Sequence, residues 1–367
     1  MEEVSKVNSG RDYKHLNQGE IPVYGTGGYM LSVDESLSDE DAVGIGRKGT
    51  IDKPQLLKAP FWTVDTLFYM TPKPNNELTF LFTLSQGIEW AKLDESTGVP
   101  SLSKVNIENV AKYIPDLHEQ AAIGSFFRNL DDIITASQRK VEGLKRLKAA
   151  YLQQMFPPAC PAGKQAGERV PRVRFVGYKG DWSETKLGEI ADIVRGASPR
   201  PIQDPKWFDE NSDVGWLRIS DVTEQGGRIR HLEQKISKAG QSKTRVLTQP
   251  HLLLSIAATV GKPVINYVKA GVHDGFLIFL NPQFEQEFMF QWLEMFRLNW
   301  QQYGQPGSQV NLNSDLVKNQ ETRIPSRKEQ FAIGNFFHNF DTQIASQSEK
   351  VEKLKQIKSA YLQKMII

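Results

Sequence analysis

The sequence predicts a mixed α/β protein in which two globular units and two long helices form an internal repeat. The segment 119–155 reappears as the segment 329–365, and every matched position is displaced by 210 residues. A longer stretch precedes each copy, and its apolar and β-branched runs are short and bounded by glycine, proline or asparagine, as in strands joined by turns. The predicted order is therefore globular unit, helix, globular unit, helix.

The duplicated segment has the features of a long amphipathic helix. Each copy begins with an N-cap residue three positions before a glutamate, Asp116 before Glu119 and Ser326 before Glu329, which predicts a capping box. Apolar side chains then alternate at intervals of three and four residues over about five heptads, which is coiled-coil spacing. One such helix alone could bury its stripe on its own domain, whereas two matched copies can pack on each other about a pseudo-two-fold axis.

We therefore predict two helices, 116–156 and 326–367, that form a coiled coil. The predicted core residues are Ile123, Phe127, Leu130, Ile134, Val141, Leu144, Tyr151, Ile333, Phe337, Phe340, Ile344, Val351, Leu354 and Tyr361.

The globular units repeat each other more weakly, as expected of two domains with one fold and different binding surfaces. Glu3–Gly10 resembles Glu189–Gly196, and Thr50–Pro54 resembles Thr259–Pro263. We expect a curved sheet in each unit. Strand-like runs in the second unit are Val246–Leu254, Val264–Ile265 and Phe276–Leu280.

Domain boundaries follow from composition. The first globular domain is predicted at 1–115 and the second at 181–325, a size that suits one compact domain each. Between the first helix and the second domain, the proline-rich stretch Phe156–Gly163 cannot continue a helix, so we predict a linker at 157–180.

Composition limits the classes of function. One cysteine, Cys160, excludes a disulfide framework and any cysteine-based zinc site, which favours a reducing cytoplasm. No apolar run approaches the roughly 18 residues that span a bilayer, so no membrane association is expected. The net charge of +2 is too small to indicate a polyanionic partner by itself, so an argument for nucleic acid must come from local patches.

Catalytic signatures are missing from the sequence. Gly44–Gly49 matches G-x-G-x-x-G, but the following Pro54 lies where a dinucleotide-binding helix would be. The six histidines show no metal-ligand spacing, and there is no triphosphate-binding loop, nucleophile elbow or suitably placed Cys–His pair. We predict a chain that recognises a partner, without a catalytic residue, a metal or a cofactor of its own.

Local basic patches indicate what that partner is. The first unit contains Arg47-Lys48-Gly49-Thr50. In the second unit basic residues accumulate among Gly, Ser, Thr, Asn and Gln: Arg195, Arg200, Arg218, Arg228, Arg230, Lys243, Arg245 and Lys262. Such side chains on glycine-rich loops position phosphates and read base edges, although an ordinary solvated surface gives similar patterns.

Several duplicated motifs resemble one known family. The two domains end in Ser101-Leu102-Ser103 to Tyr113-Ile114-Pro115 and in Asn311-Leu312-Asn313 to Arg323-Ile324-Pro325, and a Glu-Gln helix start follows each. Further motifs are Ile123–Phe127 with Leu130-Asp131, Leu144–Lys148, and Arg174–Tyr178 leading to Trp182 and Lys186-Leu187-Gly188. In this order and spacing they resemble the specificity (S) subunit of a type I restriction-modification enzyme.

The resemblance implies two target-recognition domains separated by conserved helical spacers that pack antiparallel. It implies a non-catalytic subunit that binds double-stranded DNA at a bipartite, asymmetric target. The implied partners are two methyltransferase (modification) subunits, which carry S-adenosylmethionine and methylate adenine, and restriction (motor-nuclease) subunits. The chain departs from the family pattern before Met1, where no counterpart of the lead-in to Trp182 is found, so the first domain is expected to be clipped at its start.

Candidate DNA contacts are chosen by side-chain chemistry near turns, since Arg and Gln can read guanine and adenine edges while Ser, Thr and Lys more often fix the backbone. In the first unit they are Tyr24, Thr26, Arg47, Lys48 and Thr50. In the second unit they are Arg218, Ser220, Thr259, Lys262, Gln305, Ser308 and Gln309.

Two rival functions remain at this stage. A coiled-coil scaffold without DNA readout would keep the helices but would not explain basic, glycine-rich units that diverged while the helices stayed alike. A DNA-modifying enzyme that acts alone would bind S-adenosylmethionine as an isolated chain.

Overall fold

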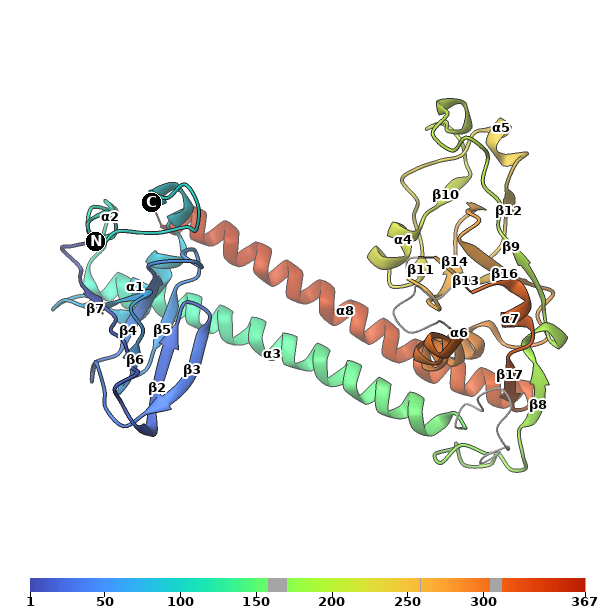
Figure 1. Cartoon of the computed structure of the whole chain (residues 1–367), viewed down its shortest axis with the longest axis horizontal. Helices are drawn as coiled ribbons and strands as arrows, with labels where there is room; N and C mark the ends of the chain where they lie inside the picture. Colours follow the sequence, from blue (N-terminus) through green and yellow to red (C-terminus); the bar gives the residue numbers. More distant parts are fainter. Residues whose placement is uncertain (158–169, 258, 304–311, 367) are drawn as a thin grey trace. The chain divides into compact units, whose positions relative to one another are not determined.

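The computed structural model describes residues 1–157, 170–257, 259–303 and 312–366. The chain forms two compact units, a first unit of Met1–Lys140 with Ser346–Ile367 and a second unit of Val141–Ala345. Each unit therefore contains one globular domain together with part of both long helices (Figure 1).

The first domain contains two small sheets and short helices. One sheet has the order β1-β7-β4-β5 and the other β3-β2-β6. The strands are β1 (Ser5–Ser9), β2 (Gln18–Gly25), β3 (Gly28–Val33), β4 (Ala42–Gly46), β5 (Gln55–Leu57), β6 (Trp62–Thr63) and β7 (Leu67–Pro72). The helices are α1 (Leu78–Gln86), the 3₁₀ turn η1 (Trp90–Leu93) and α2 (Lys104–Glu108).

The described residues of the second domain form three sheets, of orders β11-β14-β13-β16-β9, β10-β15-β12 and β17-β8. Its strands are β8 (Ser183–Lys186), β9 (Asp192–Arg195), β10 (Gly215–Leu217), β11 (Arg228–Ile229), β12 (Arg245–Leu247), β13 (Leu252–Ser255), β14 (Pro263–Asn266), β15 (Ala270–Val272), β16 (Phe276–Leu280) and β17 (Glu321–Ile324). Its helices are η2 (Leu187–Glu189), η3 (Pro205–Trp207), α4 (Ile219–Glu224), α5 (Lys238–Gln241), α6 (Gln286–Phe296), η4 (Arg297–Tyr303) and α7 (Ser314–Lys318).

The main sheets of the two domains have the same topology. In the first domain β7 lies between β1 and β4, and in the second β16 lies between β9 and β13; all these pairs are antiparallel. The fourth strand, β5 or β14, pairs with β4 or β13, and β11 extends the second sheet by one strand. The weak repeat in the sequence thus corresponds to a shared fold.

One predicted strand is divided in two. The run Val246–Leu254 forms β12 and β13, which belong to different sheets. Pro250 lies between them, and a proline has no backbone N–H to donate to a ladder.

In the first domain, the described residues that follow Gly44–Gly49 form a loop and then strand β5, and not a helix, as Pro54 predicts.

The two long helices are α3 (Leu117–Met155) and α8 (Arg327–Met365). The predicted N-caps are confirmed, because Asp116 Oδ1 accepts from the Glu119 N–H at 2.9 Å and Ser326 Oγ accepts from the Glu329 N–H at 3.4 Å. None of the helices among the described residues combines the length and apolarity needed to cross a bilayer.

Within each unit the helices run antiparallel. In the first unit Asp131 pairs with Lys358 at 2.6 Å, and in the second Lys148 pairs with Asp341 at 2.5 Å. The two pairs consist of equivalent residues, because Asp131 and Asp341, like Lys148 and Lys358, are 210 positions apart. Both units therefore use one set of helix–helix contacts.

Most predicted core residues of the coiled coil are buried or half-buried. The exception is Tyr361, which is 44% exposed and touches the Phe126 ring edge-on, with 5.2 Å between the ring centroids. Leu362 packs on the first domain's core instead. The buried residues are Ile123, Phe127, Leu130, Ile134, Val141, Ile333, Phe337 and Val351, and the half-buried ones are Leu144, Tyr151, Phe340, Ile344 and Leu354.

Some of these residues also complete the domain cores. Ile123 and Phe127 join the core of the first domain, and Ile333 and Phe337 that of the second. The apolar stripe of each long helix therefore packs both on a globular domain and on the other long helix.

The structure describes part of the predicted linker 157–180. Residues 158–169 lie outside the described part of the chain, whereas 170–180 packs on the start of α8. Arg174 binds the carboxylate of Glu329 with two hydrogen bonds of 2.6 and 2.7 Å, and the Phe175 ring packs edge-on against Phe336. The Glu329 side chain is thus held by Arg174 at the helix start.

A buried glutamine fastens each domain to its long helix. Gln330 accepts a hydrogen bond from the Glu285 N–H at the start of α6 (2.9 Å) and donates to the carbonyl of the proline that ends the domain (2.8 Å). Gln120 makes the same two bonds, to the Glu77 N–H at the start of α1 (3.0 Å) and to the equivalent proline (2.9 Å). Each amide satisfies two buried backbone groups at once.

Replacing Gln330 with alanine should lower the free energy of unfolding by about 2 kcal/mol, because a buried N–H and a buried carbonyl lose their partner. Gln120→Ala should behave alike, and Gln363→Ala, at an exposed position of α8, should change little. Denaturant unfolding of the three variants measures this, and equal stability of Gln330→Ala and Gln363→Ala would contradict it.

Candidate functional site

The first domain has a polar hollow of about 660 Å³ beside the β4–β5 loop. Arg47 and Lys48 are exposed at its edge, and the Arg47 side chain donates to the carbonyl of Asp65 at 3.3 Å. We call this surface the first hollow. Its lining residues are Arg47, Lys48, Asp65, Thr66, Glu95, Ser96, Thr97, Gly98, Val99 and Ser101.

The other candidates in the first domain, Tyr24, Thr26 and Thr50, are not among the residues that line the first hollow. Tyr24 is half-buried against the apolar cluster around Leu57 and Phe61. Thr26 lies in the β2–β3 turn, and its hydroxyl is 3.9 Å from the position that a side chain on Gly49 would occupy. The β2–β3 turn and the Arg47–Thr50 loop therefore lie next to each other, so candidate residues from both segments share one part of the surface.

Two hollows in the described part of the second domain, of about 610 and 440 Å³, share Ile202, Gln203 and His273. We treat them together as the second hollow. The larger one is lined by Ile202, Gln203, Pro205, Phe208, Trp216, Arg218, Ile219, Gln234 and His273, and the smaller adds Ser198, Pro199, Arg200, Pro201 and Asp274.

Arg218 is the N-cap residue of α4, and its side chain is held in place there. Its guanidinium donates to Asp221 at 3.0 Å, and its backbone N–H donates to the other carboxylate oxygen at 2.8 Å. The hydrogen bond with Asp221 raises the pKa of the Arg218 guanidinium. The cation is therefore permanent, and its position is fixed by a side chain that is itself buried.

His273 lines both parts of the second hollow. Burial lowers the pKa of His273, and the charges of Arg195 and Arg200 lower it further against the opposing effect of Asp274. Its Nδ1 accepts a hydrogen bond from the Gly275 N–H at 2.9 Å. The same Nδ1 lies 3.2 Å from a carboxylate oxygen of Asp274, so the ring is held in place from this side.

The remaining candidates in the second domain have different surroundings. Ser220 is exposed on α4, and the Thr259 hydroxyl is 3.3 Å from that of Ser255. Lys262 forms an ion pair with Glu294 and is 20% exposed. DNA contact by these residues stays a prediction. Gln305, Ser308 and Gln309 lie outside the described residues.

Sequence reasoning missed part of the second hollow. Gln203, Trp216, Gln234 and His273 come from four separate segments, so no local pattern connects them. One signal was available, because His273 precedes Asp274, the counterpart of Asp65 in the repeat.

Comparison with known proteins decides the family. The family model described as type I restriction modification DNA specificity domain matches residues 1–146 and 179–357. The chain belongs to this family. The fold class, the internal repeat and the family that the sequence predicted are confirmed.

A curated relative is the type I restriction enzyme MjaVIII specificity subunit of Methanocaldococcus jannaschii, which is 23% identical over 286 residues. The match covers 71% of this chain, and the chain spans 63% of that relative's length.

Two solved structures share the fold. One is a type I restriction-modification S subunit from M. genitalium, with 12% identity, a TM-score of 0.64, and coverage of 100% of this chain and 94% of that chain. The other comes from a study of complex assembly and conformational transition of the type I R-M system, with 15% identity, a TM-score of 0.57, and coverage of 99% and 95%.

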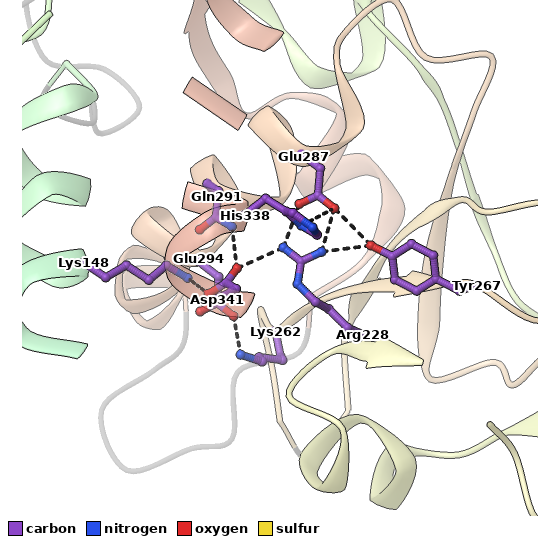
Figure 2. Close-up of polar contacts among 9 residues, drawn as sticks. All are labelled: Lys148, Arg228, Lys262, Tyr267, Glu287, Gln291, Glu294, His338 and Asp341. Atoms are coloured by element: carbon purple, nitrogen blue, oxygen red, sulfur yellow. Dashed lines mark hydrogen bonds and ion pairs between the residues drawn. The ribbon is translucent and has the colours of Figure 1, made fainter. Parts of the chain in front are cut away.

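An ion-pair network in the second unit links its recognition domain to the helices (Figure 2). Arg228, from β11, donates to both oxygens of Glu287 on α6 at 2.6 and 2.7 Å and to Asp341 on α8 at 2.9 Å. Lys148 on α3 binds the other oxygen of Asp341. Arg228 was part of the predicted basic patch, and that interpretation is corrected here, because only 13% of its side chain is exposed.

Asp341 is the centre of this network. Burial by itself would raise the pKa of Asp341, but the charges and hydrogen bonds of Lys148 and Arg228 outweigh burial and hold the pKa below its ordinary value of 3.8. Gln291 also donates to its carboxylate, at 2.8 Å. No group of three or more His, Cys, Asp or Glu side chains among the described residues could hold a metal ion.

The stability of the second unit should therefore depend on pH in acid. A carboxylate whose folded pKa is depressed stabilises the fold above its unfolded pKa, and this contribution is lost as the pH falls through the folded pKa. The free energy of unfolding, measured from pH 7 to below 3.8, should show this loss. In the Asp341→Asn variant the free energy of unfolding should fall less over the same pH range.

At neutral pH, Asp341→Asn should lower the free energy of unfolding by about 3 kcal/mol, because two cations lose a largely buried partner. The matched control is Asp131→Asn, whose side chain is 36% exposed against 19% for Asp341. An equal effect of the two substitutions would show that Arg228 adds nothing to the network.

Proposed function

We propose that this protein is the non-catalytic specificity subunit of a type I restriction-modification complex and reads a bipartite, asymmetric target in double-stranded DNA. The observation that carries the proposal is one fold that occurs twice on a common helical framework, with different side chains lining the hollow of each copy. One domain then reads one half-site, and the other reads a different half-site. The chain directs methylation and cleavage without performing either.

The helical framework accounts for a split target. The first domain is joined covalently to the second through α3, and α8, which follows the second domain, contributes residues to both units. Each helix has 39 residues, and domains held in this way would not slide independently along a duplex. Base pairs between the half-sites would face the helices and go unread, so that the protein fixes the spacer length and leaves its sequence free. Half-site spacing follows dimer geometry by the same reasoning in other DNA-binding proteins.

The proposed partners are two methyltransferase subunits, which would carry S-adenosylmethionine, and restriction subunits that join the complex. Matched apolar side chains on the two helices support two equivalent docking sites: Leu147 on α3 and Ile357 on α8 are 46% and 45% exposed and lie 210 positions apart. A function on cellular DNA places the complex in the cytoplasm.

The test combines the purified chain, its methyltransferase partner, S-adenosylmethionine and a library of random duplexes. Sequencing of retained and methylated DNA should give a split motif with an unread centre that requires both proteins. Assembly with the partner but no sequence enrichment would instead support the scaffold function. Binding of S-adenosylmethionine by the isolated chain would support an enzyme that acts alone.

The spacer provides a sharper prediction. One base pair inserted between the half-sites shifts one of them by about 3.4 Å and rotates it by about a tenth of a turn. We expect methylation of that duplex to fall at least tenfold, whereas base changes at constant spacer length leave it unaltered. Equal methylation at both spacer lengths would mean that the domains bind independently.

A further inference from the structure

The first and second hollows share one equivalent loop of the repeated fold, the loop before β7 in the first domain and the loop before β16 in the second. Asp65 and Thr66 line the first hollow directly before β7, and His273 and Asp274 line the second directly before β16. β7 and β16 are equivalent strands of the two main sheets. Each copy of the fold therefore has a hollow beside this loop, and the rest of the lining comes from different segments, the β4–β5 loop in the first domain and the loop after β9 in the second.

The chemistry of the two linings differs. The first hollow presents the cations of Arg47 and Lys48 together with hydroxyl groups such as Thr66. The second presents an amide, Gln203, with Arg218 and His273, beside apolar walls that include Trp216. A shared loop with different chemistry around it is what two surfaces need in order to read two different sequences.

The second hollow is built from fixed groups. The loop that carries Gln203 is anchored through Ser198, whose hydroxyl donates to Asp274 at 2.9 Å, and through Trp207, whose indole N–H donates to the Pro201 carbonyl at 2.9 Å. Elsewhere in the lining, Asp221 holds Arg218. Preorganised donors and acceptors lose less entropy on binding, which favours discrimination among ligands.

The lining also differs from a site for phosphates alone. Arg and Gln side chains can form two hydrogen bonds with guanine or adenine in the major groove, and apolar walls can contact the thymine methyl group. Lys262, a candidate outside the hollow, is already paired with Glu294. Arg218 is also paired, with Asp221, but 38% of its side chain is exposed, against 20% for Lys262.

We propose that the two hollows are the base-reading surfaces, with Gln203, Arg218 and His273 determining one half-site and Arg47, Lys48 and Thr66 determining the other. This assignment rests on the proposed function, because it presupposes a split DNA target. It places specificity at the loops before β7 and β16 and gives each domain its own, separable share of the motif.

The experiment uses the chain in complex with its methyltransferase partner and a library of random duplexes. Gln203→Ala and Arg47→Ala are compared with the unaltered chain, since both side chains are exposed and their loss leaves the cores intact. Gln283→Ala is the matched control, an exposed glutamine that follows the opposite end of β16. The readout is base preference at every position of both half-sites.

We expect Gln203→Ala to relax the preference at one or two positions of one half-site by about tenfold, and Arg47→Ala to do the same in the other half-site only. Gln283→Ala should leave the motif unchanged. A uniform loss of retention with the motif preserved would overturn the assignment, because it would show contact with phosphates only. If the unaltered complex enriches no split motif, the proposed function itself fails.

Discussion

Burial of the apolar stripe on each long helix is the constraint on which the rest of the structure depends. An isolated helix gains little stability from propensity and needs packing along its length. On α3, Phe127 enters the core of the first domain, Leu130 and Ile134 are buried further along, and Phe156, just past the helix, enters the core of the second domain. Ile366 does the converse after α8. Each core thus requires both helices, so helix positions are far less free to change than domain surfaces.

Polar contacts add direction to this packing. Gln120 and Gln330 fix the first turn of α1 and α6 against the long helices, and they do so identically because they bind backbone groups, which every sequence has. Arg228 goes further in the second unit, since it reaches from β11 to both α6 and α8. β11 is the strand by which the second main sheet exceeds the first. The more elaborate domain therefore carries its own additional attachment.

The parts of this molecule that the sequence could predict are those encoded locally. Helix starts at Asp116 and Ser326 and the alternating apolar spacing depend on residues a few positions apart, and comparing the two copies doubles the signal. The second hollow depends on segments that meet only in the folded domain, such as Gln203 and His273. Lys262 and Arg228 were taken for surface cations because their partners Glu294 and Asp341 are far away in sequence.

Some basic side chains of the second domain form ion pairs within the protein and are therefore not available to bind DNA phosphates. Of the basic residues in the second domain, Arg228 and Lys262 are neutralised within the unit, whereas Arg200 is 82% exposed even though it contacts Asp274. A chain with a net charge of +2 also offers little general attraction for a polyanion. Non-specific affinity grows with the number of phosphates neutralised, so a weakly basic subunit contributes little of it. Under the proposed function, such a subunit supplies discrimination through a few positioned side chains.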